Sequence, residues 1–543
     1  MSVASIKTIT ENHPRLWLGS LLGLIALVTW VACALLGCPW RLALFWALFA
    51  PSIGLWVLKG RQLAGRPIAC FVAIAAPLGL LYCCFMPAIV SVSWDGYAHY
   101  RSAAAIAAGQ ERLLSVGELT NFDPDGIYNV GPFPWGTSED DWSANWSTIQ
   151  QDGNLDRAQA YMDRWDQVTF PQEESPETSL QPTRLPNALG LALAQACGAP
   201  LSVQLFCGRL TNMIAYIALM ALAMSRLVSG RRILLVFGLT PTLLFMAANY
   251  SYDPCAIALL SLAGASFAKE LQTPHEPLSL GRAAWILAPW VIGTYTKAVF
   301  LPAALLFLFM PRCKFKRPRD RVLWIGAATL CVVGLLASFV VPYLFDNASI
   351  APDTRGGSTS IDSLGQLRFI LEHLWAYPLI LLASFINVFT PFQLFANLFI
   401  NFCYLPIPSG WPLFSAAFIG CLAWSVVADR TQADDFGAQP RYRWSLFIGI
   451  FLGFCLMATA LYLNYTNLGA PLVLGLQVRY LLFEMGPFLL ICLNFGSGPA
   501  THLAQKARSW AGARAAAAAP LALSGIMAAL SWAIFISGFV MRL

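Results

Sequence analysis

The chain has 543 residues, of which 57% are hydrophobic and only 11% are charged. This composition excludes an ordinary soluble domain, because no soluble core needs so many apolar residues, and it is typical of a polytopic α-helical membrane protein. The formal net charge of +6 is modest, and the stretch 94–185 is rich in Asp and Glu, which argues against nucleic acid as a partner.

Apolar runs of about 18–25 residues recur along the chain and predict an all-α fold with about 13 transmembrane helices. We expect three parts. They are an N-terminal transmembrane hairpin over 1–66, a transmembrane core over 67–496, and a C-terminal cytoplasmic loop with a last transmembrane helix over 497–543. The expected spans are 17–38, 42–58, 67–93, 201–228, 233–250, 254–271, 283–296, 298–310, 322–345, 410–428, 444–463, 479–496 and 515–540.

Short basic segments between the spans predict the orientation, because Lys and Arg gather in cytoplasmic loops. All four basic segments face the cytoplasm if the N-terminus is cytoplasmic. Two large loops, 94–200 and 346–409, then lie on the outer face, and we expect them to carry short helices. This topology requires 283–310 to be a hairpin of two short helices with Lys297 at its outer tip. It also makes 374–409 interfacial or re-entrant, since another span would reverse the charge pattern. The basic segments are 59–66, 226–232, 311–321 and 506–514.

The first outer loop begins with WDGYAHYRSAAAIAAGQ at 94–110. Asp95 and His99 are four residues apart, so they share one face if this stretch is helical. A carboxylate there can take a proton from a hydroxyl group, and the imidazole can orient the carboxylate or bind a substrate. Asp is also a favoured N-cap, and Trp94-Asp95-Gly96 is typical of a helix start. The pattern leaves a catalytic role and a capping role open.

Two further charges lie near the outer ends of expected spans. Asp253 follows Asn249 and precedes Pro254, which is an N-cap and first-turn pattern, although Asp253 would face the same outer vestibule as Asp95. Arg209 lies about two turns inside a span, where a charge is costly unless it has a partner. That partner is either structural, such as Asp253, or a lipid phosphate.

The remaining cations lie at the same expected depth. Lys297, in GTYTKAVFLP, is either a snorkelling lysine or a point charge for a phosphate. Arg479, between Gln477 and Tyr480, is either an interfacial anchor or a fork that grips a phosphate. Glu484 lies inside the following span and needs a partner, such as one of these cations. An acidic vestibule with separated cations suits a substrate that has a lipid tail, a phosphate and a polar group.

In their order and spacing, these residues resemble the bacterial membrane proteins catalogued as domain of unknown function 2142. The resemblance covers roughly 67–496, and each motif is short, so the ordered set carries the specificity. One position departs from the family pattern, because Gly96 stands where the family usually has a second acid. The matching residues are Asp95, His99 and Arg101; Arg209 and Leu210; Pro241, Asn249 and Asp253; Lys297; and Gln477, Arg479 and Tyr480.

That family in turn resembles the GT-C class of polytopic glycosyltransferases, which use polyprenyl-phosphate sugars as donors. The resemblance implies an enzyme of the bacterial cytoplasmic membrane that moves a sugar, with inversion, to an extracytoplasmic cell-envelope glycan or lipid-linked acceptor. It implies no cofactor beyond the donor lipid and leaves a divalent metal open. Asp95 and His99 would be catalytic. The substrate-binding residues would be Arg101, Arg209, Asp253, Lys297, Gln477, Arg479 and Tyr480.

Two other functions remain open from the sequence. One is a transporter or flippase of lipid-linked sugars, although the chain shows no internal repeat and its charges lie near the outer face rather than the midplane. The other is a non-catalytic partner of envelope-assembly proteins. In each case the expected partners are membrane lipid and a lipid-linked sugar.

Overall fold

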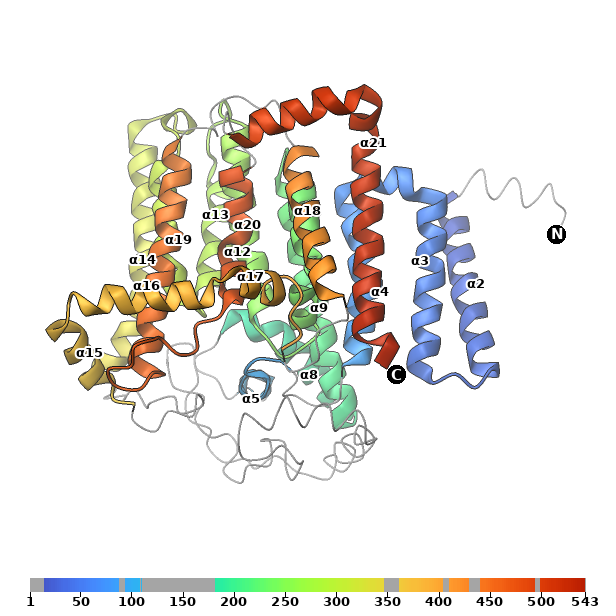
Figure 1. Ribbon diagram of the computed structural model, residues 1–543, viewed down its shortest axis with the longest axis horizontal. Coiled ribbons are helices and arrows are strands. Elements are labelled where there is room, and N and C mark those ends of the chain that lie inside the picture. The colour runs from blue at the N-terminus through green and yellow to red at the C-terminus, as the bar shows by residue number, and fades with distance from the viewer. Residues whose placement is uncertain are drawn as a thin grey trace.

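The computed structural model describes residues 14–86, 93–107, 109, 181–345, 361–403, 410–428, 440–493 and 499–542. These residues form helices and connecting loops, with no strand among them (Figure 1). Most of the long helices run side by side in one direction, as helices that cross a membrane do. The predicted all-α fold is confirmed.

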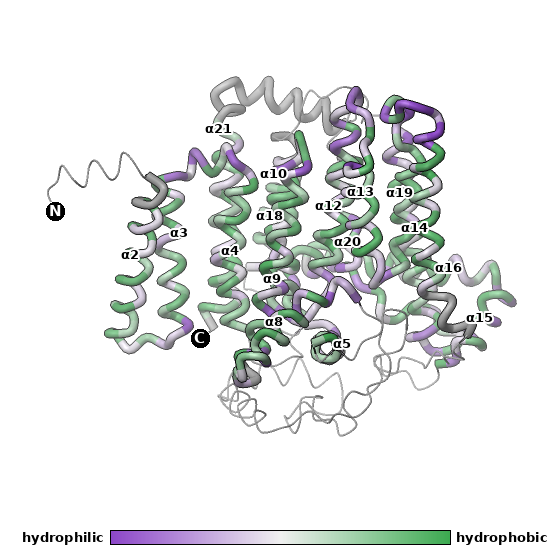
Figure 2. Tube along the Cα trace, turned by 180° about the vertical axis from the view of Figure 1, so that it is seen from behind, coloured by the Kyte–Doolittle hydropathy of each residue, from purple (hydrophilic) through white to green (hydrophobic). Residues whose placement is uncertain are grey.

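Eight helices in the described ranges are long and apolar enough to cross a membrane. Figure 2 shows apolar residues along the middle of the bundle and hydrophilic residues gathered toward its two ends. The chain is therefore a multi-pass membrane protein. The eight helices are α2 (Pro14–Leu35), α3 (Trp40–Ala64), α4 (Pro67–Phe85), α9 (Leu201–Arg226), α12 (Asp253–Gln272), α14 (Pro318–Phe345), α19 (Pro440–Asn464) and α21 (Pro499–Gly538).

The other five expected spans are helical but short or interrupted, so the expected number of about 13 is not confirmed. The segment 233–250 breaks into two helices at Pro241, whose ring and missing N–H prevent one continuous helix. A helix of fewer than 18 residues is too short to count as a span by length alone, and the side chains of α18 (Trp411–Ala428) are described only over Trp411–Ser425. These elements are α10 (Arg231–Gly238), α11 (Pro241–Ala247), α13 (Leu280–Thr294), η4 (Ala298–Phe309), α18 (Trp411–Ala428), α20 (Leu481–Phe488) and η9 (Leu489–Leu493).

The expected hairpin over 283–310 is present as α13 and η4, with Lys297 in the turn between them. Its second arm is a 3₁₀-helix of 12 residues rather than an α-helix. A 3₁₀-helix rises about 2.0 Å per residue, so this arm is about 24 Å long, whereas an α-helix of equal length would be about 18 Å. Because a 3₁₀-helix is longer per residue, this winding brings the short arm closer to the length that is needed to cross a membrane.

Three of the four basic segments meet at one end of the bundle, which we call the basic end. Side-chain hydrogen bonds to backbone carbonyls tie 59–66, 226–232 and 311–321 to one another and to the end of α12. The fourth segment, 506–514, lies in α21, but its side chains are outside the described residues. The bonds are Arg232 Nη2 to Ala64 O (3.3 Å), Gln272 Nε2 to Ser229 O (2.9 Å) and Lys314 Nζ to Thr273 O (2.7 Å).

The central helix α12 is buried along almost its whole length and has a buried carboxylate near each end. At the basic end, Glu270 forms ion pairs of 2.7 Å with both Arg282 and Lys314. Asp253 begins the helix at the opposite end, which we call the site end. Seventeen residues at 1.5 Å each place the two carboxylates about 26 Å apart along the helix.

Several short helices lie at the site end rather than in the bundle. A bend of 111° separates α15 (Ser363–Glu372) from α16 (Ala376–Val388), and α16 runs across the long helices, as an interfacial or re-entrant segment would. Figures 1 and 2 both place α5 (Gly96–Ala107) and α8 (Leu185–Ala196) beneath the bundle at this end. Most of the expected outer loop 94–200, and the start of 346–409, lie outside the described residues. The other short elements here are η3 (Pro182–Arg184), α17 (Pro391–Asn397) and η8 (Val478–Tyr480).

Candidate functional site

Five segments that are far apart in the chain bring charged or titratable side chains together at the site end. The segments are the start of α5, η3, the start of α12, the turn between α13 and η4, and η8. We call this group the charged cluster. Its members are Asp95, His99, Arg184, Asp253, Lys297 and Arg479.

Asp253 is held in place by the loop that precedes it. The amide of Asn212, on α9, lies 3.0–3.2 Å from the carbonyl oxygens of residues 247, 249 and 251, and it fixes the turn between α11 and α12. Ser251 Oγ then accepts a hydrogen bond from the Asp253 N–H at 3.3 Å. The carboxylate occupies the first turn of α12, where the helix dipole favours negative charge.

The Asp253 carboxylate joins two cations. Its Oδ1 lies 3.2 Å from Lys297 Nζ, and its Oδ2 lies 3.0 Å from Arg479 Nη1. The Asp253 side chain is 2% exposed and that of Arg479 is 5% exposed, so water screens this pair little. The sequence suggested Arg209 as one possible partner of Asp253, but the structure gives these contacts to Lys297 and Arg479.

Lys297 sits in an aromatic cage beside that carboxylate. Its ammonium lies 5.4, 4.7 and 4.5 Å from the ring centres of Tyr252, Tyr480 and Phe483, which are cation–π distances. Burial lowers the pKa of Lys297 more than any other single effect, but Asp253, Tyr252 and Tyr480 together outweigh it, and the pKa is raised. The lysine therefore remains a cation, and it is still 18% exposed.

Arg479 is fixed from three sides. Its Nε donates to Gln477 Oε1 at 2.6 Å, its Nη1 donates to Asp253, and its guanidinium carbon lies 4.5 Å from the Trp94 ring centre. Tyr480 covers it on another side at 5.2 Å. These contacts leave Nη2 of Arg479 without a partner among the described residues, so one face of the fork can receive a ligand.

Asp95 lies at the edge of the cluster and is only partly buried. Its φ of +52° is the left-handed region, which Asp tolerates better than most residues. Its carbonyl oxygen accepts a hydrogen bond from the His99 N–H at 3.0 Å, as the carbonyl of an N-cap residue does, so Asp95 stands at the start of α5. Its carboxylate is also in electrostatic contact with Arg479. Asp95 therefore faces the cluster.

His99 and Arg184 form the other side of the cluster. Arg184 is 5% exposed, donates from Nη1 to Ser102 Oγ, and has its Nη2 3.5 Å from His99 Nδ1. Because a guanidinium only donates, His99 Nδ1 is the acceptor here, and a neutral His99 has its proton on Nε2. The Tyr252 ring lies against both side chains, 4.7 Å from the His99 ring centre and 5.1 Å from the Arg184 guanidinium carbon.

Two other expected residues do not join the cluster in the structure, and the side chain of a third is not among the described residues. Arg209 is buried within α9, and it interacts electrostatically with Tyr250, Cys83 and Arg41. Glu484 is buried in α20, with no hydrogen-bond partner for its Oε1 among the described residues, so the expected cation does not reach it. The backbone of Arg101 lies in α5, but its side chain is outside the described residues.

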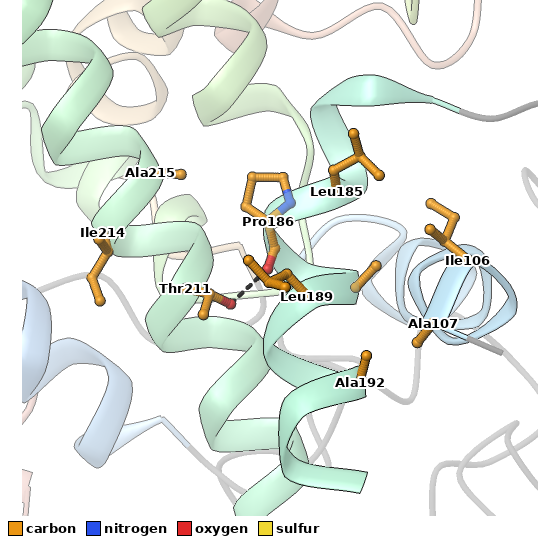
Figure 3. A pocket seen from close by; sticks show the side chains of 10 residues that line it. Ile106, Ala107, Leu185, Pro186, Leu189, Ala192, Thr211, Ile214 and Ala215 are labelled. Atoms are coloured by element: carbon orange, nitrogen blue, oxygen red, sulfur yellow. Dashed lines mark hydrogen bonds between the residues drawn. The ribbon is translucent and has the colours of Figure 1, made fainter. Parts of the chain in front are cut away.

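Beside the cluster, an apolar groove of about 580 Å³ lies between α5, α8 and α9 (Figure 3). It does not contain the charged residues, but it begins next to them, because Leu185 follows Arg184 in the chain. In the described residues, no group of three His, Cys, Asp or Glu side chains is arranged to hold a metal ion. The groove is lined by Ile106, Ala107, Leu185, Pro186, Ala188, Leu189, Ala192, Thr211, Ile214 and Ala215.

Comparison with known families gives one match. The model of the family described as "Predicted membrane protein (DUF2142)" matches residues 183–492, which is more than half of the chain. The chain belongs to this family. No protein with a curated description and no solved structure matches it. The matched stretch includes Arg184, Asp253, Lys297 and Arg479, whereas Asp95 lies before it.

Proposed function

We propose that this DUF2142 protein is a membrane glycosyltransferase that moves a sugar from a polyprenyl-phosphate donor to an acceptor hydroxyl. The observation that supports it best is the convergence of Asp95, Asp253, Lys297 and Arg479 at one end of a multi-pass bundle. Fixed cations at a membrane end suit a lipid phosphate, and a partly exposed carboxylate beside them suits a general base. The acceptor is an extracytoplasmic glycan or lipid-linked glycan if the basic end faces the cytoplasm.

The two carboxylates have different roles in this proposal. Both oxygens of Asp253 are engaged by cations, so Asp253 orients Lys297 and Arg479. Asp95 is partly exposed at the edge of the cluster, where an acceptor can reach it. His99 lies within the same short helix and, with its proton on Nε2, can donate a hydrogen bond to the acceptor or to Asp95.

The reaction is an in-line displacement at the anomeric carbon. The acceptor oxygen forms the new bond to that carbon, its proton passes to Asp95, and the bond to the phosphate oxygen breaks with inversion. Negative charge builds on the leaving lipid phosphate as this bond breaks. The remaining N–H groups of Lys297 and Arg479 stabilise that charge more in the transition state than in the ground state.

A transfer assay with purified chain in nanodiscs and candidate polyprenyl-phosphate sugars tests this proposal. Asp95→Asn should lower the rate by about 10²-fold or more, as expected for loss of a general base. Glu276→Gln, which removes an exposed carboxylate at the basic end, serves as the matched control and should keep the wild-type rate. If Asp95→Asn retains most of the activity, Asp95 is not the base.

A second candidate is movement of a lipid-linked sugar across the membrane, and Glu484 favours it. A buried acid inside a membrane segment is costly and often marks a transport path. A fluorescent lipid-linked sugar in proteoliposomes distinguishes the two functions. Translocation without any new glycosidic bond would support the transporter and reject the transferase.

A further inference from the structure

The apolar groove beside the charged cluster has the properties of a chain-binding site. Its volume of about 580 Å³ lies within the range of about 300–1,000 Å³ that is usual for small-molecule sites. Among the described residues that line it, no side chain is charged, and the one hydroxyl, of Thr211, already donates to Pro186 O at 2.6 Å (Figure 3). A molecule in this groove is therefore held by apolar contact along its length.

Small side chains give the groove its depth. Alanines from three different helices line it, and Figure 3 shows the α8 side chains lying between α9 and α5. The close approach of α8 to α9 depends on Gly190, because a Cβ there would lie 2.3 Å from the Cys207 carbonyl oxygen. The groove therefore results from the packing of α5, α8 and α9 at the site end.

Arg184 stands where the groove meets the charged cluster. It directly precedes Leu185, which lines the groove, and its guanidinium donates to Ser102, one helical turn before Ile106. Its guanidinium is buried and packs over the Tyr252 ring, whose neighbour in the chain is Asp253. A chain lying in the groove would therefore present its polar end to a fixed cation, which matches a phosphate better than a neutral group.

We propose that this groove binds the single hydrocarbon chain of an isoprenoid phosphate and that Arg184 contacts its phosphate. This inference rests on the proposed function for the choice of an isoprenoid. The sequence analysis did not indicate Arg184. The groove lies on the side of the cluster formed by α5, α8 and α9, and α9 is the long span that lines it. A groove of this size accommodates part of one chain, not the two chains of a phospholipid.

Photo-crosslinking tests the proposal without requiring catalysis. The probe is farnesyl phosphate with a diazirine on its chain, added to the full chain in phosphatidylcholine nanodiscs, with adducts mapped by peptide mass spectrometry. We expect wild-type adducts on residues 185–192 and 211–215. Unlabelled farnesyl phosphate should compete for these adducts, and dioleoyl phosphatidic acid should not. Adducts elsewhere, or equal competition by the two-chain lipid, would overturn the proposal.

Two substitutions test the chain site and the phosphate contact separately. Ala192→Phe fills the groove and should lower the adduct yield at least about tenfold, whereas Ala32→Phe, on the exposed face of α2, should leave it unchanged. Arg184→Gln should lower the yield about tenfold for the phosphate probe but not for the matching farnesol probe. Equal loss for both probes would reject the phosphate contact. An unchanged yield in Ala192→Phe with a wild-type melting temperature would reject the groove.

The outcome is separable from that of the transfer assay, because the probe has no sugar. Groove adducts in a protein that transfers no sugar would support the lipid site and reject the transferase function. Full transfer activity in Ala192→Phe, with adducts mapped elsewhere, would keep the transferase and reject the groove.

Discussion

Asp253→Asn is expected to be among the most damaging isosteric changes in the chain. It keeps the shape of the side chain but leaves Lys297 and Arg479, at 3.2 and 3.0 Å, without their shared carboxylate. Removing one partner of a buried ion pair typically costs about 3–5 kcal/mol, because the remaining charge is uncompensated. Here two cations lose that partner, although Lys297 is 18% exposed and water relieves part of its share. We therefore expect a loss of about 4 kcal/mol.

Intrinsic fluorescence provides the assay, since the chain has 19 tryptophans. At about 2.1 cal/mol/K of unfolding entropy per residue, one kcal/mol shifts the Tm of a chain of 543 residues by about 1 °C, so the Tm in detergent should fall by roughly 3–4 °C. Glu276→Gln is the matched control, because Glu276 is 59% exposed in its ion pair with Arg282. Pairs of that kind contribute about 0–1 kcal/mol, and the control should melt within about 1 °C of wild type.

A double substitution makes the reasoning sharper. In Asp253→Asn combined with Lys297→Met, the orphaned ammonium is gone, and the methionine remains among the rings of Tyr252, Tyr480 and Phe483. The double variant should therefore be more stable than Asp253→Asn alone, which is a coupling that neighbouring sites show and distant sites do not. If Asp253→Asn melts with the control, or if the two changes add, the carboxylate does not hold these cations.

Three other changes have expected outcomes. Glu270→Gln should lower the stability by about 3–5 kcal/mol, since Glu270 holds Arg282 and Lys314 at the basic end, but the transfer rate per folded molecule should not change. Glu484→Gln should shift the Tm by less than about 2 °C, because a buried carboxyl without a partner is cheaper as a neutral group, and an amide replaces it closely. Gly190→Val should cost about 1–3 kcal/mol by forcing α8 off α9, and loss of the farnesyl phosphate adducts would report it.

The fold class was predictable because a bilayer leaves the backbone little choice. Apolar runs must be helical there, so composition and run length were enough for the all-α, multi-pass arrangement. The number of spans was not predictable in the same way. Hydropathy finds an apolar segment, but it does not report that Pro241 divides 233–250 into two helices, or that 298–310 winds as a 3₁₀-helix. The 3₁₀ winding depends on packing against neighbouring helices, whereas the break follows from Pro241 itself, which hydropathy does not weigh.

Most of the cluster was also visible in the sequence, because ionisable residues beside apolar runs are few. What the sequence lacked was the pairing. Asp253 and Arg479 are 226 positions apart, and no local pattern joins them. The sequence indicates how deep Arg209 lies in the membrane, but it does not indicate which face of α9 carries it. In the structure, Arg209 interacts electrostatically with Arg41 and Tyr250. Arg184 was missed because an arginine in a polar loop gives no signal until the fold buries it.

The balance of charge in the cluster supports an anionic ligand. Its described side chains comprise two carboxylates, Asp95 and Asp253, and three permanent cations, Arg184, Lys297 and Arg479. Leaving His99 out of the count, this set has an excess of one positive charge. A neutral sugar would not need that excess, whereas a phosphate entering from the apolar groove reduces it and gains from sites already fixed by aromatic rings and by Asp253. In the proposed transfer, the partly exposed position of Asp95 suits a base, because the acceptor would arrive from water, on the side away from the lipid.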